Sequence, residues 1–221
     1  AGSTAVLQRS RGAQTRTIPV MTERSEWTRI IEEDPEHSQR YIQRFRGLAA
    51  EGFDLGGEAR LVDAMAGRGS RILDAGCGPG RVGAILFDRG HDVVGVDGDP
   101  ELIAAAEEDH PGPAWLVGDL AELDLTASGI SEPFDVIVCA GNVMAFLAAS
   151  TRRVVLERLR MHLSDDGRLV TGFGAGRGYE FDSFFEDAEA AELRIDLRAS
   201  SWDLRSLRED SDFLVAVLSR I

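Results

Sequence analysis

The sequence contains no lysine, because all 24 basic residues among its 221 residues are arginine. Chemistry that needs a side-chain amine is therefore excluded, including the Schiff-base lysine of pyridoxal phosphate enzymes and the P-loop lysine of nucleotide-binding proteins. Positive charge is scarce overall, and the formal net charge is −14. Since nucleic-acid binders normally carry a basic face that neutralises phosphates, we expect neither DNA, RNA nor an anionic membrane as a partner.

Cysteine and histidine are few and scattered. The two cysteines are Cys77 and Cys139, and the four histidines are His37, His91, His110 and His162. No spacing is typical of a zinc site or a disulfide framework, so we predict no metal site and expect two small, buried, reduced thiols. No apolar run approaches the roughly 20 residues of a membrane span, and no signal-peptide core is visible. These absences predict a soluble, cytoplasmic protein.

The pattern of residues divides the chain into three parts. Residues 1–20 are polar and predict a flexible leader, with Ala1-Gly2-Ser3 typical of a cloning remnant and Met21 as a candidate natural start. An ordered arm is the alternative for this segment. Residues 21–66 place apolar side chains at helical spacing and predict an N-terminal cap of two or three helices, with Gly52 ending one of them.

Residues 67–221 alternate short apolar strands with helices. Strands are predicted at 71–74, 92–97, 115–117, 134–139 and 168–173, and helices at 81–89, 100–108, 150–163 and 181–191. Ser150 is the expected cap of its helix, and residues 165–167 are expected to form a turn. Two late strands, 193–197 and 213–218, have no helix between them and should pair antiparallel. The predicted fold class is α/β: a Rossmann-like, seven-stranded, mostly parallel sheet with helices on both faces and a C-terminal antiparallel strand pair.

A glycine-rich turn follows the first strand and reads Asp74-Ala75-Gly76-Cys77-Gly78-Pro79-Gly80-Arg81. Alternate glycines let the backbone turn tightly and let a ligand approach closely, and the free N–H groups of the next helix face the same space. A dinucleotide site needs Gly-x-Gly-x-x-Gly, but Arg81 stands where its third glycine belongs. The acid Asp74 suits a cofactor that carries an ammonium and a sulfonium group, and it opposes a pyrophosphate.

The next three strands lead to further candidate ligand-binding residues. Strand two ends at Asp97, followed by Gly98, and this carboxylate can accept hydrogen bonds from both hydroxyls of a ribose. Strand three leads to Asp119 and Leu120, which suit the exocyclic amine and the ring edge of an adenine. Strand four leads to residues 139–142, expected near the reacting group. Because ligands bind beyond the carboxyl ends of parallel strands, these residues should share one site, although an acid at a strand end can also simply stabilise a turn.

With these residues in order, the chain resembles the class I S-adenosylmethionine-dependent methyltransferases. The resemblance rests on four motifs, residues 71–86, 93–100, 115–123 and 134–146, and covers roughly residues 67–221. It implies S-adenosylmethionine as cofactor and S-adenosylhomocysteine as product. Together with two residues of the cap, the predicted cofactor-binding set is Asp74, Gly76, Cys77, Gly78, Gly80, Asp97, Gly98, Asp119, Leu120, Ala140, Asn142, Tyr41 and Arg46. No catalytic residue is predicted, because in-line methyl transfer depends chiefly on alignment in a dry pocket.

Two segments are candidates for closing the site. One is the cap, where similarity to small-molecule methyltransferases implies that Tyr41 or Arg46 meets the carboxylate of the cofactor. The other is residues 172–185, whose glycines would give mobility and whose aromatic residues would give an apolar wall. For each segment the alternative is an ordinary amphipathic or core-packing helix.

The sequence after strand four bears on the acceptor. It shows neither the Asn-Pro-Pro-Tyr of enzymes that methylate exocyclic amines nor the Pro-Cys of cytosine C5 enzymes. With the negative charge, this favours a small-molecule acceptor, and a protein acceptor is the alternative. Two other functions compete: a nicotinamide-dependent oxidoreductase, against which Arg81 and Asp74 count, and a non-catalytic S-adenosylmethionine-binding module. Nothing in the sequence indicates an oligomeric state.

Overall fold

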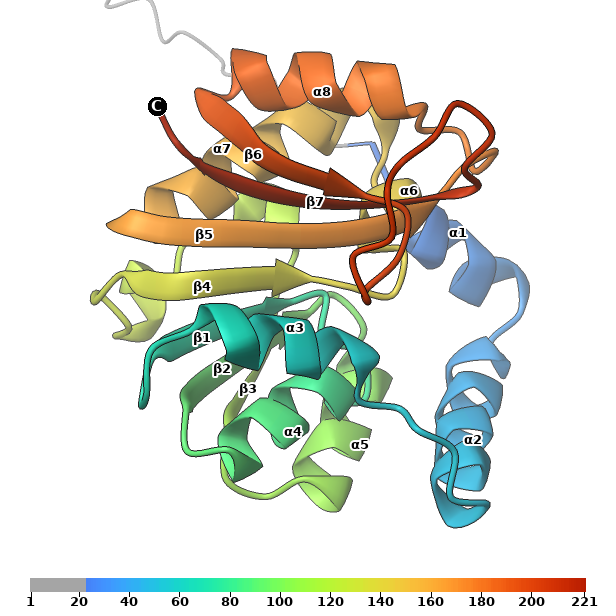
Figure 1. The fold of residues 1–221 in the computed structure, drawn as a ribbon. Coiled ribbons are helices and arrows are strands. Elements are labelled where there is room, and N and C mark those ends of the chain that lie inside the picture. The colour runs from blue at the N-terminus through green and yellow to red at the C-terminus, as the bar shows by residue number, and fades with distance from the viewer. Residues whose placement is uncertain (1–22) are drawn as a thin grey trace, which may run out of the picture.

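The computed structural model describes residues 23–221, so the predicted leader, residues 1–20, lies outside the described residues. A seven-stranded sheet in the order β3-β2-β1-β4-β5-β7-β6 forms the centre of the molecule (Figure 1). β7 runs antiparallel to both β5 and β6, and the other adjacent strands of this sheet are parallel, which confirms the predicted α/β fold with its C-terminal antiparallel pair. The strands are β1 (Arg71–Ala75), β2 (Asp92–Asp97), β3 (Ala114–Val117), β4 (Phe134–Cys139), β5 (Leu163–Gly174), β6 (Leu193–Ala199) and β7 (Phe213–Arg220).

Helices cover both faces of the sheet, with α3, α4 and α5 on one side and α7 and α8 on the other (Figure 1). Consecutive residues of β1 serve the two faces: Ile72 packs with residues of α3 and α4, and Leu73 with residues of α7 and α8. The α-helices are α1 (Glu26–Glu33), α2 (His37–Ala50), α3 (Gly57–Met65), α4 (Arg81–Asp88), α5 (Pro100–Asp109), α6 (Val143–Phe146), α7 (Arg152–His162) and α8 (Phe181–Ala190). Short 3₁₀ helices are η1 (Leu120–Glu122), η2 (Thr126–Ser128) and η3 (Ala149–Thr151). Within residues 23–221, no helix has both the length and the apolar character that crossing a membrane requires.

The expected turn at residues 165–167 is wrong, because β5 already begins at Leu163. Leu163 pairs with Phe134 and Arg168 pairs with Val136, so the strand bulges between these two pairs. A Cβ on Gly167 would lie 2.9 Å from the carbonyl oxygen of Phe134. The glycine therefore lets the chain bulge against β4 where the sequence alone indicated a turn.

The expected capping role of Ser150 is also wrong. Thr151 occupies the N-cap position of α7, and the preceding residues form η3. The Ser150 hydroxyl instead donates to the carboxylate of Glu23 at 2.9 Å. The side chain that was expected to cap α7 thus forms a hydrogen bond with a residue 127 positions away in the sequence.

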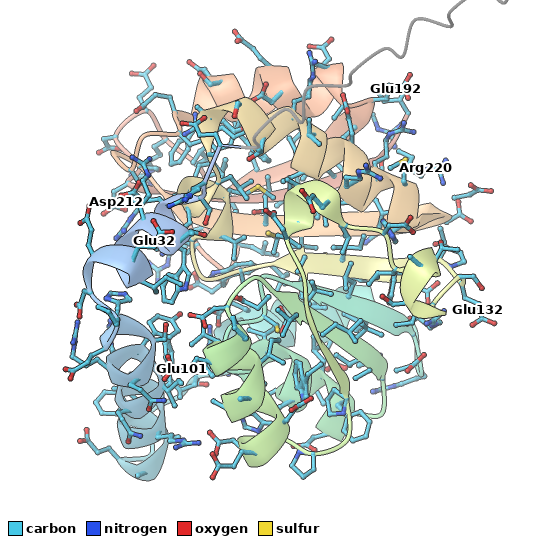
Figure 2. The ribbon with its side chains drawn as sticks, turned by 180° about the vertical axis from the view of Figure 1, so that it is seen from behind. Glu32, Glu101, Glu132, Glu192, Asp212 and Arg220 are labelled. Atoms are coloured by element: carbon cyan, nitrogen blue, oxygen red, sulfur yellow. The ribbon has the colours of Figure 1, made fainter. Side chains whose placement is uncertain are left out.

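Helices α1 and α2 form a helical cap beside the carboxyl ends of the parallel strands (Figure 1). Ile42 of α2 is buried against Leu102 and Ala105 of α5. Glu101, at the start of α5, lies next to α2 (Figure 2) and accepts a hydrogen bond from Gln39. The cap therefore packs on α5 and stands over the point between β1 and β4 where the strand order reverses.

Candidate functional site

A cavity of about 240 Å³ lies between the helical cap and the strand ends. It is lined by the turn after β1, by the ends of β2, β3 and β4, by α6, and by α1 and α2. Ten of the thirteen predicted cofactor-binding residues line it: Tyr41, Asp74, Gly76, Cys77, Gly78, Asp97, Gly98, Asp119, Leu120 and Ala140. The topology thus brings together side chains from four strand ends and from the cap.

The turn after β1 is shaped by close packing beneath it. Gly76 has φ +76°, and a Cβ there would lie 2.4 Å from Cγ2 of Val143, so any larger residue would push α6 away. Gly80 has φ +81° and forms the N-cap of α4, where a Cβ would lie 3.0 Å from the ring of Trp115. The left-handed conformation and the lack of space both require glycine at these positions.

Asp74 is a buried acid at the end of β1. One of its carboxylate oxygens accepts the backbone N–H of Gly83 at 2.8 Å, so the side chain caps the first turn of α4 from the neighbouring strand. Burial raises the pKa of Asp74 to about 7. Asp74 thus stabilises a turn, as the sequence allowed, and also presents an acidic group to the cavity.

Asp97 holds a fixed position at the end of β2. Its two carboxylate oxygens accept the backbone N–H groups of Gly78 at 2.8 Å and Asp99 at 2.9 Å. Burial raises the pKa of Asp97 above its usual value, although these backbone hydrogen bonds oppose the rise. Each oxygen has a second lone pair, so the carboxylate can still accept hydrogen bonds from a pair of vicinal hydroxyls.

The third strand end forms an edge that is partly polar and partly apolar. Asp119 accepts the backbone N–H of Ala121 at 2.8 Å and caps η1, and Leu120 is buried beside it. Val117 also lines the cavity, and 57% of this residue is exposed. Sequence reasoning missed Val117 as a site residue, although an apolar side chain at a strand end was the available signal. Such an edge suits a flat ring that carries an amine.

Aromatic side chains form the cap side of the cavity. The ring of Trp27 packs edge-to-face against Tyr41 at 5.3 Å and against Phe146 of α6 at 5.6 Å between ring centroids. Tyr41 also contacts Phe45 at 4.9 Å, and burial raises the pKa of the Tyr41 hydroxyl. All four residues line the cavity, so α1, α2 and α6 together exclude water from one side of it.

Asp99 connects the helical cap to the strand end, a role that sequence reasoning missed. One of its oxygens accepts the indole N–H of Trp27 at 2.9 Å and the hydroxyl of Ser38 at 2.5 Å. Its other oxygen caps α5 at the backbone N–H of Glu101, as the Asp-Pro pattern predicted. Asp99 is 3% exposed, and its own N–H donates to Asp97. One buried carboxylate therefore links α1 and α2 to the position of Asp97.

Arg81 pairs with Glu58, an interaction that could not be predicted from the sequence. Its guanidinium makes two hydrogen bonds with Glu58 of α3, at 2.6 and 2.9 Å, and one with the carbonyl of Leu55 at 2.5 Å. It also lies 5.5 Å from the centre of the Phe45 ring. The residue that spoils the dinucleotide pattern thus fixes α3 and α2 against the start of α4.

Three predicted cofactor-binding residues do not line the cavity. Gly80 packs against Trp115, as described above. The side-chain oxygen of Asn142 accepts the backbone N–H of Gly174 at 2.8 Å, which directs it toward the end of β5. Arg46 pairs with Asp109 at 2.8 Å and Glu108 at 2.9 Å at the end of α5. Acidic side chains at the end of α5 thus hold the Arg46 guanidinium at the contact between α2 and α5, and it does not line the cavity.

Residues 172–185, the second candidate for closing the site, contribute nothing to the cavity lining. Phe173 and Tyr179 stack at 5.6 Å between ring centroids, and Phe184 packs against both. All three rings are fully buried. Tyr179 and Phe184, two of the aromatic residues that suggested a pocket wall, are therefore core residues between β5 and α8. Phe181 and Phe185 are partly buried against the same core.

The hydrogen-bonding groups that line the cavity fit S-adenosylmethionine. Three carboxylates, Asp74, Asp97 and Asp119, line the cavity, and each is positioned by backbone N–H groups. Carboxylates can accept hydrogen bonds from an ammonium group, ribose hydroxyls and an exocyclic amine, whereas they repel a pyrophosphate. Added Cβ atoms at Gly98 and Gly141 would meet no atom closer than 3.9 Å, so the space beside these residues is open to a ligand.

Comparison with known proteins gives one family. A model of the methyltransferase domain family matches residues 72–167. A solved TehB-like S-adenosylmethionine-dependent methyltransferase from Corynebacterium glutamicum is 51% identical over 85% of this chain and 100% of that chain, with a TM-score of 0.80. The magnesium-protoporphyrin O-methyltransferase of Rhodobacter capsulatus is 31% identical over 59% of this chain and 56% of that protein. The malonyl-[acyl-carrier protein] O-methyltransferase of Pectobacterium atrosepticum is 30% identical over 48% of this chain and 39% of that protein.

The chain therefore spans about half or less of the length of these two curated relatives, but the whole of the solved one. The nicotinamide-dependent oxidoreductase reading is not favoured, because the matches are methyltransferases. The sheet order, the glycine turn and the high identity to the solved relative agree. This chain belongs to the class I S-adenosylmethionine-dependent methyltransferases.

Proposed function

We propose that this protein binds S-adenosylmethionine in the cavity and transfers its methyl group to a small-molecule acceptor. One observation supports the proposal above all. The glycine turn, Asp97 and Asp119 line a single cavity together with aromatic side chains of the helical cap. Membership of the methyltransferase family supports S-adenosylmethionine as the cofactor. The geometry of the cavity supports the assignment of individual residues to the parts of this cofactor.

Each part of the cavity has a task in this proposal. When bound, S-adenosylmethionine supplies an electrophilic methyl group on a sulfonium. Asp97 accepts hydrogen bonds from the ribose hydroxyls, and Val117, Asp119 and Leu120 hold the adenine. Asp74 offers negative charge to the cationic part. The cap residues exclude water and hold the acceptor in line, which is the main requirement of a displacement reaction.

We also propose that the helical cap, α1 and α2, closes the site of a cofactor-binding domain formed by residues 67–221. The last part of the predicted segment 21–66, α3, packs on the sheet of that domain instead. Trp27 and Tyr41, which lie in the proposed cap, line the cavity, and Asp99 of the proposed domain binds Trp27. The two regions would therefore act as one unit when the site closes around its ligands.

We propose a small molecule as the methyl acceptor, and the relatives do not indicate which small molecule it is. The names of two curated relatives give acceptors as unlike as magnesium-protoporphyrin and a malonyl group on an acyl-carrier protein. The net charge of −14 supports a small molecule over a nucleic acid. A cytoplasmic location is also proposed, supported by the free thiols of Cys77 and Cys139, both of them buried.

Thermal unfolding with added ligands tests the cofactor. Ligand at about 100 times its Kd stabilises a protein by roughly 2.7 kcal/mol, which for this size raises Tm by roughly 5–10 °C. We expect S-adenosylmethionine and S-adenosylhomocysteine to raise Tm and NADH to leave it unchanged. A rise with NADH alone would refute the proposal.

A separate measurement distinguishes the enzyme from a non-catalytic binding module. Purified protein is incubated with methyl-labelled S-adenosylmethionine and a small-molecule extract. Mass spectrometry follows the labelled methylated product and the unlabelled S-adenosylhomocysteine that forms with it. We expect product formation that depends on the extract and is lost in the Asp97→Ala variant. Binding without turnover across many extracts would favour the module.

A further inference from the structure

The charges around the cavity are mostly negative. Of the described residues that line it, Asp74, Asp97 and Asp119 are acids and Arg81 is the base. The Arg81 guanidinium is already occupied by Glu58, at 2.6 and 2.9 Å, so it is neutralised before any ligand enters. Within residues 23–221 the side chains that line the cavity therefore offer no free cation to an anionic acceptor, which would lose its hydration without gaining a partner from the protein.

The end of the cavity between α1 and α6 is apolar. Ile31 of α1 faces it together with Phe146 and Leu147, and Trp27 packs on Phe146. We call this part, lined by Thr28, Ile31, Phe146 and Leu147, the acceptor end. Asp119 and Val117, which suit the adenine, line the same cavity.

The hydroxyl groups at this end already have partners. The side-chain oxygens of Ser25 and Thr28 lie 2.9 Å apart and share a hydrogen bond, and Ser25 also accepts the backbone N–H of Thr28 at 3.1 Å. Ser25 is the N-cap of α1, so this pairing is part of the helix start. A ligand at the acceptor end thus meets mainly carbon surface.

We propose that the acceptor of this methyltransferase is a small, uncharged and largely apolar molecule that binds at the acceptor end. The inference rests on the proposed function and deepens it. A nitrogen, oxygen or sulfur lone pair of the acceptor forms the new bond to the methyl carbon, and the electron pair of the broken carbon–sulfur bond stays on sulfur. A proton carried by the nucleophile leaves to water.

Binding of a matched ligand pair tests the proposal without knowledge of the natural acceptor. Indole and indole-3-carboxylate share one ring system and differ by a single anionic group. Their Kd values are measured by ligand-observed NMR on the full chain saturated with S-adenosylhomocysteine. We expect indole to bind at least tenfold more tightly, because the acceptor end is apolar and the surrounding charge is negative.

A second test of the proposal introduces a positive charge at the acceptor end. Ile31→Arg places a cation in the acceptor end, and Ile30→Arg makes the same change one residue earlier, at a position outside the cavity lining. We expect Ile31→Arg to reduce the preference for indole at least tenfold or to reverse it. Ile30→Arg should leave the preference within about twofold of the unmodified protein.

Three results would overturn the proposal: absence of indole binding, equal or tighter binding of indole-3-carboxylate, or the same change of preference in both variants. Binding of S-adenosylhomocysteine is measured by calorimetry on the same samples. If that ligand fails to bind, the proposed function is refuted, and the indole pair measured without it still reports on the acceptor end. The two failures are therefore distinguishable.

Discussion

At the scale of single residues, the cavity acids are held by the backbone and not by cations. Asp74, Asp97 and Asp119 each accept at least one backbone N–H, and the cation that lines the cavity with them, Arg81, is bound to Glu58. Backbone donors fix the orientation of a carboxylate without neutralising it as a bound cation would, although burial raises the pKa of Asp74 and of Asp97. These acids are therefore oriented and still available to a cationic, hydroxyl-bearing ligand.

Replacing Asp97 by alanine should weaken S-adenosylmethionine binding by about 1.5–3 kcal/mol, because hydrogen bonds to a charged group are lost. Titration calorimetry measures the change. The matched control is Asp92→Ala at the other end of β2, where the carboxylate pairs with Arg71 on the surface and lies outside the cavity lining. Equal affinities for the Asp97 variant and the unmodified protein would remove Asp97 from the site.

The raised pKa of Asp74 predicts how stability depends on pH. Its pKa is about 7 in the folded chain and 3.8 when unperturbed, so between about pH 4 and 7 the folded state keeps a proton that the unfolded state has lost. Stability contributed by this group therefore falls as pH rises through that window. Asp74→Asn cannot titrate, and its amide oxygen can still accept the N–H of Gly83.

Urea unfolding at pH 5 and pH 8 measures this effect on Asp74. Relative to the unmodified protein, Asp74→Asn should gain roughly 2–3 kcal/mol in unfolding free energy between the two pH values, since one pKa unit corresponds to about 1.4 kcal/mol. The measurement is made without added cofactor, because a cationic ligand would lower the pKa of Asp74. A difference that does not change with pH would contradict the assignment.

At the scale of elements, the helical cap and α5 behave as one assembly. Trp27 of α1 and Ser38 of α2 both donate to Asp99, which also caps α5. Ile42 packs on α5 and Arg46 pairs with its last acidic residues. Because the N–H of Asp99 also holds Asp97, movement of the cap would be transmitted to the carboxylate at the end of β2.

Trp27→Phe tests this link, because it keeps an aromatic ring and removes the N–H that reaches Asp99. The loss of one hydrogen bond should cost about 0.5–1.5 kcal/mol in cofactor binding and should speed amide hydrogen exchange in α1. Trp202→Phe is the control, since Trp202 packs beside Gly172 away from the cavity. Unchanged exchange in α1 together with unchanged affinity would show that the Asp99 contact does not hold the cap.

At the scale of the whole molecule, the strongest general feature is its negative charge. A formal net charge of −14 makes the folded chain repel itself, and added salt screens this repulsion. We expect Tm to rise when potassium chloride increases from 10 to 150 mM at pH 7.5, where the screening length falls from about 30 to about 8 Å. Differential scanning calorimetry measures Tm, and a fall in Tm with salt would mean that attractive ion pairs outweigh the net repulsion.

The order of elements and the main binding turn could be predicted from the sequence. The bounds predicted for β2 and β4 are those of the structure, and the Asp99-Pro100 start of α5 and the glycine turn at residues 76–80 were predicted as found. These features are local. Hydrophobic periodicity, helix capping and positive φ depend on residues a few positions apart, so a linear pattern carries them.

The way in which these parts pack together could not be predicted from the sequence. Trp27 donates a hydrogen bond to Asp99, 72 positions away, and Arg46 donates one to Asp109, 63 positions away. Val143 fills the space beside Gly76. The bulge in β5 likewise depends on its pairing with β4. Such contacts arise when distant segments are packed together, and no periodic signal in the sequence marks which polar group will find which partner. Local rules therefore fixed the elements, whereas long-range packing fixed the cap, the cavity wall and the orientation of the cavity acids.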